Sequence, residues 1–484
     1  MATKKKSTRK ATKARSPKTA KKRPAKRGAA KASAKRTLNG LKERIRIRMY
    51  RQGLGDCFLL TIPGTSGKPF YVVIDCGVIL GTQDADKKMN EVVEHIIQTT
   101  GGHIHLLAAT HEHWDHISGF GQARNLWTDK SRLKIDQVWL SWAEDKSDPL
   151  AKKLKEQHDS LRLNLHAAAA RLALSGDHES AHEISSLLGF LGASAGSTAD
   201  ALEVVRNLSE DLRYCKPKDA PVLLPGTDVK VYTLGPPPDE KAIKRFNPSK
   251  KNPETYELSA MDNFMAAIVP ALLPADPNAP DLDAPFAAPL QIPMQAGRQM
   301  PFFQSYYWGE SVDCGEKDQS WRRIDGSWLD SSTAMALALD SATNNTCLVL
   351  AFELPDGDVL LFAADAQVGN WLSWQDLSWD VEGTKVTGPD LLNRTIFYKV
   401  GHHGSHNATL REKGLEEMKS LKLAFVPVDH AMAVKKRWNK MPLNSLMDAL
   451  NEATHQCVVR IDEDVPAGLK NSVASEKLFH EVVL

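Results

Sequence analysis

The chain of 484 residues has no apolar run that approaches the ~18 residues of a membrane-spanning helix. Its first residues are basic and lack the apolar segment of a secretory signal. The six cysteines are scattered, with no CxxC pair and no spacing typical of a disulfide framework. Together these absences predict a cytoplasmic protein with buried, reduced thiols and no membrane contact.

Acidic residues are missing from positions 1–38, which carry 16 Lys and Arg. The rest of the chain holds 46 basic against 59 acidic residues, so a cationic tail precedes an acidic body. The tail has almost no large apolar side chain and cannot bury enough surface to offset the entropy of ordering. We therefore expect residues 1–40 to be disordered and residues 41–484 to form the folded part.

A tail of this composition can bind nucleic acid by releasing counterions, with little sequence preference. Nucleic acid is therefore the expected partner, and association with a nucleoid is one expected location within the cytoplasm. The alternative is a tail that aids solubility or localisation, or that pairs with the acidic body. The sequence carries no signal for an oligomeric state.

Strand and helix patterns begin at Arg44. The segments IRIRMY, FYVVIDCG and HIHLLAAT are typical of strands, and residues 86–99 carry apolar positions at helical spacing. Strands that alternate with helices indicate an α/β fold. Two stretches interrupt this pattern, a helical insertion at 148–215 and a Pro-rich insertion at 236–330, and the sequence assigns neither a function.

Three imidazoles and a carboxylate follow the strand HIHLLAAT within six residues: His111, His113, Asp115 and His116. Imidazole and carboxylate are good ligands for zinc and similar divalent ions. From one loop, His111 and His113 can bind one cation while Asp115 and His116 bind a second, about 3.5–4 Å away. The alternative is a His-rich surface loop, against which stands the apolar strand directly before it.

This cluster resembles the HxHxDH signature of the metallo-β-lactamase superfamily. The segment 74–77, which ends in Asp75 and Gly77, resembles the first motif of that superfamily, and residues 401–405 resemble the segment with its last histidine ligand. Residues 360–366 resemble the strand that delivers a metal-bridging aspartate, here Asp365, although Ala364 stands where glycine is usual. The resemblance implies an αββα sandwich, here with helical and Pro-rich insertions and the disordered basic tail.

Within the superfamily, the chain is most similar to the soluble hydrolase domain of the DNA-uptake protein ComEC. Four segments carry this similarity: GLGD at 53–56, LGPPP at 234–238, NNTC at 344–347 and HHGS at 402–405. It covers roughly residues 45–145, 225–240 and 335–465, and both insertions lie outside it. It implies a metal-dependent nuclease or phosphodiesterase.

The resemblance also implies the ligand sets. Many superfamily members add a third histidine to the first site, where this chain has Thr343, Asn344 and Asn345. The first site would then hold His111, His113 and Asp365 with water. The second would hold Asp115, His116, Asp365 and one of His402 and His403, which their spacing cannot separate, the other one contacting substrate. Two divalent ions are expected, Zn²⁺ first and Mn²⁺ as the alternative.

Candidate catalytic residues are Asp75, Asp115, Lys399 and His402. Divalent ions lower the pKa of bound water towards about 7, which supplies hydroxide at neutral pH. Asp75 is expected to orient a ligand histidine or the hydroxide, and Lys399 or a histidine to neutralise developing charge. The alternatives are a hydrolase of a lactone, thioester or amide, and a nucleic-acid-binding regulatory protein with a degenerate site.

Overall fold

The computed structural model describes residues 45–174, 198–245, 294–307, 339–436 and 438–484, with position 292 and isolated positions between 178 and 188. Residues 44–484 form one unit. The expected disorder of residues 1–40 and most of the Pro-rich insertion lie outside the described residues.

The first mixed sheet has eight strands in the order β16-β17-β1-β2-β3-β4-β5-β6. The pairs β3–β4, β4–β5 and β5–β6 are parallel, and the other pairs are antiparallel. The strands of this sheet are β1 (Arg46–Tyr50), β2 (Cys57–Ile62), β3 (Phe70–Cys76), β4 (His103–Ala109), β5 (Lys134–Ser141), β6 (Asp211–Cys215), β16 (Val473–Ser475) and β17 (Phe479–Val483).

The second mixed sheet has seven strands in the order β15-β14-β13-β10-β9-β8-β7. Strands β9 and β10 form the hairpin that the turn Pro355-Asp356-Gly357-Asp358 predicts. The strands are β7 (Val222–Leu223), β8 (Lys230–Gly235), β9 (Val349–Glu353), β10 (Val359–Phe362), β13 (Thr395–Lys399), β14 (Leu423–Val426) and β15 (Val458–Arg460). A separate hairpin pairs β11 (Ser378–Val381) with β12 (Thr384–Thr387).

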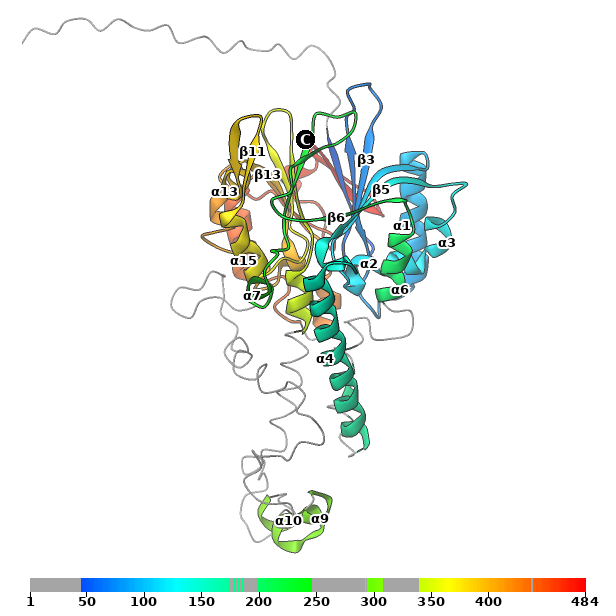
Figure 1. Ribbon diagram of the computed structural model, residues 1–484, viewed down its shortest axis with the longest axis vertical. Coiled ribbons are helices and arrows are strands. Elements are labelled where there is room, and N and C mark those ends of the chain that lie inside the picture. Colours follow the sequence, from blue (N-terminus) through cyan, green and yellow to red (C-terminus); the bar gives the residue numbers. More distant parts are fainter. Residues whose placement is uncertain are drawn as a thin grey trace, which may run out of the picture. The chain divides into compact units, whose positions relative to one another are not determined.

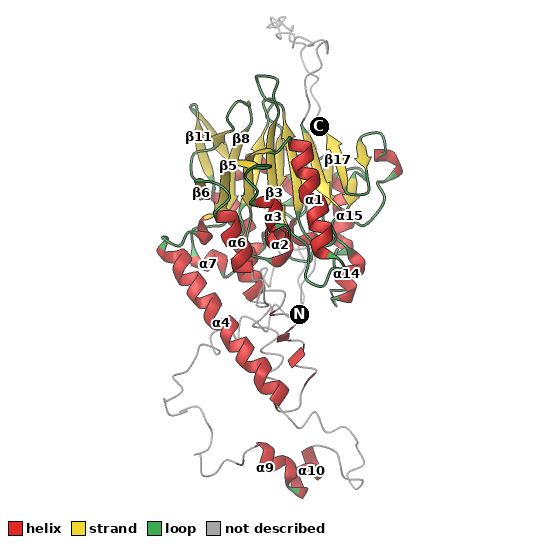
Figure 2. Cartoon of the chain, turned by 90° about the vertical axis from the view of Figure 1, so that its right-hand side faces the viewer, coloured by secondary structure: helices red, strands yellow, loops and turns green. Residues whose placement is uncertain are grey.

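The two sheets face each other across a shared apolar core. Phe58 of the first sheet meets Phe362 of the second edge to face, with ring centroids 5.6 Å apart. Helices cover the outer face of each sheet, and Figure 1 shows α1 and α3 on one side and α13 and α15 on the other. Figure 2 shows α1 lying along the outside of the first sheet. The strands β3, β10, β13 and β14 are buried on both faces and have parallel partners, so they read as nearly continuous apolar runs in the sequence.

The α-helices are α1 (Ala85–Thr100), α2 (Trp114–Gln122), α3 (Arg124–Trp127), α4 (Pro149–Leu174), α6 (Thr198–Arg206), α7 (Glu240–Ile243), α9 (Met294–Gln299), α10 (Pro301–Tyr307), α12 (Val368–Ser373), α13 (Gly388–Asn393), α14 (His430–Lys435) and α15 (Asn444–Ala453). Short 3₁₀ turns are η1 (Trp142–Glu144), η6 (Trp374–Asp376), η7 (Gly401–Gly404), η8 (Leu415–Glu417) and η9 (Ala467–Leu469). Across the part of the chain that the structure describes, no helix is long and apolar enough to cross a membrane.

The expected α/β class is confirmed, with mixed sheets. One expectation needs correction, because the segment 148–215, predicted as helical throughout, ends in the strand β6. Four of the five residues of β6 are exposed or only partly buried, so the apolar alternation of a strand is weak there. Its pairing with β5 is a tertiary contact, which no local sequence pattern predicts.

The carboxyl ends of β3 and β4 in the first sheet, and of β10 and β13 in the second, lie at one edge of the fold. The parallel pairs β3–β4 and β10–β13 bring these ends together within each sheet. Between the sheets, Leu348 N–H donates to the carbonyl of Thr110 at 2.8 Å, and Ser141 Oγ donates to the carbonyl of Thr346 at 2.8 Å. The loops that follow these four strands therefore converge.

Candidate metal centre

The loop after β4 enters α2 with its polar side chains turned into this edge. His113 is the extended residue before α2, and Asp115 and His116 lie in the first turn of the helix. Glycine is required where this turn packs: a Cβ on Gly77 would lie 2.4 Å from the carbonyl of Asp115, and one on Gly55 would lie 2.6 Å from that oxygen. The two glycine turns after β1 and β3 thus set the position of the loop.

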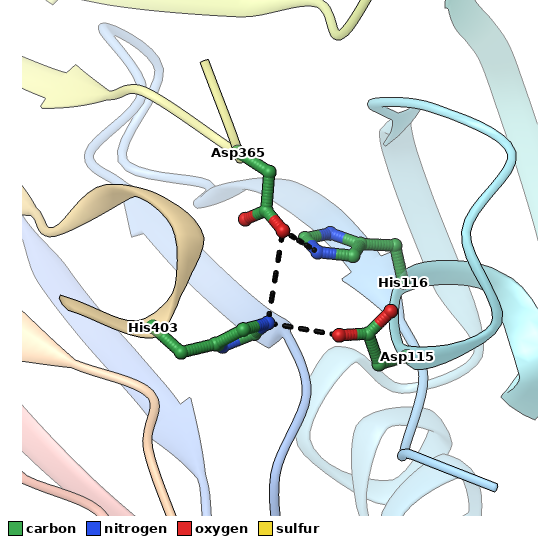
Figure 3. A group of neighbouring side chains, drawn as sticks. All are labelled: Asp115, His116, Asp365 and His403. Atoms are coloured by element: carbon green, nitrogen blue, oxygen red, sulfur yellow. Dashed lines mark hydrogen bonds and ion pairs between the residues drawn. The ribbon is translucent and has the colours of Figure 1, made fainter. Parts of the chain in front are cut away.

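Four buried side chains, Asp115, His116, Asp365 and His403, form the first of two ligand groups (Figure 3). His403 Nε2 lies 2.9 Å from Asp115 Oδ2 and 3.7 Å from Asp365 Oδ2, and His116 Nε2 lies 3.1 Å from Asp365 Oδ2. Ligands of a tetrahedral zinc ion, at about 2.0–2.1 Å from the metal, are about 3.3 Å apart. The spacing of this group therefore suits a single cation.

The second ligand group consists of His111, His113 and Asp365, all buried. His111 Nε2 lies 3.1 Å from His113 Nδ1, again the separation of two ligands on one cation. Asp365 belongs to both groups, so its carboxylate stands between two candidate cation positions. The sequence-based ligands from three separate strand ends are thus brought together in space.

Hydrogen bonds fix the ring orientation of two of these histidines. His116 Nδ1 lies 2.8 Å from Asp75 Oδ2, and Asp75 also accepts from the N–H and hydroxyl of Thr110, both at 2.7 Å. His403 Nδ1 lies 2.8 Å from the carbonyl oxygen of Pro427. A proton on each Nδ1 leaves Nε2 with its lone pair towards the group, as in other metal-ligating histidines. The expected orienting role of Asp75 matches this geometry.

Ala364 occupies left-handed backbone, with φ of 48°, in the loop that presents Asp365. This conformation favours glycine, which explains why the resembling motif usually has glycine there. The carbonyl of Ala364 accepts from Lys399 Nζ at 2.9 Å and from the N–H of His402 at 3.1 Å. Two hydrogen bonds therefore hold this backbone turn, one from a side chain of β13 and one from the loop that follows β13.

Lys399 points inward and is almost fully buried. Its ammonium forms an ion pair with Asp56 and lies 3.6 Å from Asp365 Oδ1. Burial lowers its pKa, but the two carboxylates more than offset this, and the net pKa is raised. The ammonium is thus held by the protein, an arrangement that favours balancing Asp56 and Asp365 over contact with a substrate.

Negative charge exceeds positive charge in this pocket. Asp56, Asp75, Asp115 and Asp365 are buried with Lys399 as their ammonium partner, so among the described residues neutral histidines would leave three negative charges uncompensated. Oδ1 of Asp115 and Oδ1 of Asp56 are buried without a hydrogen-bond partner. Buried carboxylates are normally paired or bound to a metal, and the donor set therefore fits divalent cations. These buried His and Asp groups can hold a metal ion.

Protonation in the metal-free pocket follows from these charges. Burial lowers the pKa of His111 well below its usual value and that of His113 to about 4. Burial opposes the charged forms of His116 and His403 as well, but Asp365 and the neighbouring aspartates raise both pKa values. Without a cation, the neighbouring aspartates therefore favour the protonated rings of His116 and His403.

Metal binding is expected to release protons, because ligating imidazoles must be neutral at the ligand nitrogen. The apparent affinity should rise with pH, since the raised pKa values of His116 and His403 keep both rings protonated at lower pH. Calorimetric titration with Zn²⁺ in Tris and in PIPES, which differ in ionisation enthalpy, measures this release. Equal heats in both buffers would contradict it.

His402 lies beside the ligand groups and belongs to neither of them. Its N–H donates to Asp365 Oδ1 at 3.0 Å, while its ring is 2.8 Å from Ser405 Oγ and 3.4 Å from Asn344 Nδ2. Burial lowers the pKa of His402 to about 4, so the half-buried ring is neutral at pH 7. The structure thus separates the two histidines: His403 faces a cation position, and the predicted metal contact of His402 finds no support.

Glu112 stands between two ligands in the sequence and turns away from them in the structure. Glu112 Oε2 lies 2.6 Å from Lys155 Nζ of α4, and Oε1 accepts from Thr198 Oγ1 of α6 at 3.0 Å. Burial and the charge of Glu112 raise the pKa of nearby Glu144 to about 7. This partly buried polar contact fastens the helical insertion to the metal-site loop, and no motif in the sequence predicts the role of Lys155.

A third cluster, His103, His105 and Asp136, lies at the amino end of β4, away from the converging loops. His103 Nε2 lies 2.7 Å from Asp136 Oδ2. The N–H of Tyr71 donates to His105 Nδ1 at 3.0 Å, which uses that lone pair and places the ring proton on Nε2. This cluster therefore lacks the ligand form that the first two groups have.

Comparison with known proteins adds no family assignment. No family model matches the chain, and no curated protein matches it.

Proposed function

We propose that this chain is a metal-dependent hydrolase of the metallo-β-lactamase superfamily that cleaves phosphodiester bonds. The observation that carries the proposal is the pair of buried ligand groups that share Asp365. Two facing sheets with outer helices, and ligands on three strand ends, are what the resemblance to the superfamily and to the ComEC hydrolase domain implies. The fold alone does not determine the reaction, so the proposal depends on the residues of the site.

Two divalent cations bound by these groups would supply hydroxide at neutral pH and stabilise negative charge on a phosphoryl group. The protein residues hold this arrangement in place. Asp75 fixes the ring of His116, and the carbonyl of Pro427 fixes that of His403. The ammonium of Lys399 forms an ion pair with Asp56 and lies close to the carboxylate of Asp365.

Hydrogen-bonding groups beside the ligands suit a phosphate oxygen. His402, Ser405 and Asn407 form one cluster, with Ser405 Oγ donating to Asn407 Oδ1 at 2.9 Å. The neutral ring of His402 lies next to Asp365 and is partly exposed. Neutral hydrogen-bonding groups next to a metal centre can orient a diester without competing for the cations.

Metal analysis and a substrate panel on one preparation test the proposal. The full chain, reconstituted with Zn²⁺ or Mn²⁺, is incubated with single- and double-stranded DNA, RNA, a chromogenic phosphodiester, a lactam, a thioester and a lactone. We expect about two ions per chain and cleavage of phosphodiesters alone. His103→Ala is the matched control, because it removes a histidine of β4 outside both ligand groups. Fewer than one ion per chain, or cleavage confined to carbonyl substrates, would contradict the proposal.

Deletion of residues 1–38 is expected to weaken DNA binding and to flatten its salt dependence, since the segment carries 16 cationic side chains. Turnover of a small phosphodiester should stay unchanged, because no part of the described metal centre comes from that segment. Binding measured between about 50 and 200 mM salt checks the slope. Equal DNA affinity of both forms at every salt concentration would show that the tail has another role.

A further inference from the structure

Three of the metal-facing imidazoles have an oxygen at the nitrogen that points away from the cation positions. His116 has Asp75, His403 has the carbonyl of Pro427, and His111 Nδ1 lies 3.0 Å from Thr110 Oγ1. Such outer partners fix the tautomer and the direction of a ligand, and their loss typically weakens metal binding roughly 10–100-fold. The fourth metal-facing imidazole belongs to His113.

Asp340 lies on the far side of the His113 ring. Its Oδ1 is 3.8 Å from His113 Nε2, in the helical turn that leads into β9. Asn344, one turn later, donates from Nδ2 to Asp340 Oδ2 at 3.1 Å. This contact fixes the carboxylate, and its other oxygen, Oδ1, is buried without a hydrogen-bond partner.

The direction of the His113 ring follows from its other nitrogen. Nδ1 lies 3.1 Å from His111 Nε2, so Nδ1 is the atom that faces the shared cation position. An imidazole bound through Nδ1 carries its proton on Nε2, and that N–H then points to the side where Asp340 stands. A closing shift of less than about 1 Å brings this N–H within hydrogen-bond distance of Asp340 Oδ1.

We infer that Asp340 is the positioning carboxylate of the His111–His113 metal site, acting through His113 Nε2. The inference rests on the proposed function, because it needs that site to hold a cation. The site has two imidazoles and the shared Asp365 as its protein ligands. The orientation of His113 therefore affects metal affinity more than it would in a site with three imidazoles. Through Asp340, the segment after the second insertion also contributes a residue to the metal centre.

Metal affinity of variants tests this role without any assay of turnover. The metal-free full chain and the variants Asp340→Ala, His113→Ala and the double variant are titrated with Zn²⁺ against a chromophoric chelator. Asp340→Ala is expected to weaken one of the two bound ions roughly 10–100-fold and to leave the other unchanged. In the His113→Ala background, Asp340→Ala should cost nothing further, because its action passes through the missing ring.

Two further variants complete the experiment. Asp340→Asn keeps an acceptor oxygen without the charge, and we expect a smaller loss than for alanine. Asp136→Ala is the matched control, since it removes a carboxylate that contacts a histidine of β4 outside both ligand groups, and it should leave both ions in place. Thermal unfolding of each metal-free variant verifies that the chain is folded before titration.

Unchanged affinity for both ions in a folded Asp340→Ala variant would overturn the inference and leave the proposed function standing. So would an equal loss in the wild-type and His113→Ala backgrounds, because Asp340 would then act independently of the ring. A wild-type chain that binds no metal would overturn the proposed function together with the inference.

Discussion

Replacement of Asp365 by alanine is expected to remove both metal ions and to reduce phosphodiester hydrolysis by on the order of 10³-fold or more. Its carboxylate is the one ligand common to both groups, 3.1 Å from His116 Nε2 in the first and grouped with His111 and His113 in the second. Loss of an outer partner costs about 10–100-fold in metal affinity, and a ligand shared by two cations must cost more.

Metal content and turnover, measured on the same preparation, check the Asp365 prediction. Asp136→Ala is again the matched carboxylate control and should retain about two ions and full activity. The variant also removes a contact of the buried Lys399 ammonium, so its fold is verified by circular dichroism in the presence of a chelator. Two bound ions in Asp365→Ala would show that the groups do not share this ligand.

Replacement of Lys399 by methionine is expected to destabilise the metal-free protein by roughly 3–5 kcal/mol. The methionine chain fills similar volume, but Asp56 then stays buried without its ammonium partner. The hydrogen bond to the carbonyl of Ala364, at 2.9 Å, is lost as well. Bound cations carry part of the missing positive charge, so the loss should be smaller in metal-loaded protein.

Urea unfolding with and without a chelator measures the effect of Lys399→Met. The control Lys385→Met lies on an exposed position of β12 and should change the free energy of unfolding by less than about 0.5 kcal/mol. Adding Asp56→Asn to Lys399→Met should recover part of the loss, because it removes the unpaired charge. An unchanged midpoint for Lys399→Met in chelator would mean that Asp56 is neutral in the folded protein.

The sequence was sufficient to predict the α/β class and the set of residues that gather at the site, because both are written in local patterns. Apolar strands end directly before His111 and before Asp365, and parallel strands bring such ends to one edge. The sequence could not predict side-chain positions that depend on the direction of the backbone. His402 and His403 are neighbours, both with positive φ, 41° and 51°, and this tight turn sends their rings to different surroundings.

Other features depend on contacts between distant segments. Strand β17, at the end of the chain, pairs with β1 at the start of the folded part, and nothing in the local sequence of either strand selects that partner. Asp340 is an isolated aspartate after the second insertion, so its approach to His113 is visible only in three dimensions. The sequence predicts the ligands better than the groups that orient them, because orienting groups need no fixed spacing.

Both insertions leave the sheets at the edge where the ligands converge. The first follows β5 and brings Lys155 to Glu112, and the second lies between β8 and β9, ahead of Asp340. The segments that border the candidate metal centre can therefore change while the strands that carry the ligands stay the same. We expect relatives with other insertions to keep the ligands and to differ in the molecules that reach them.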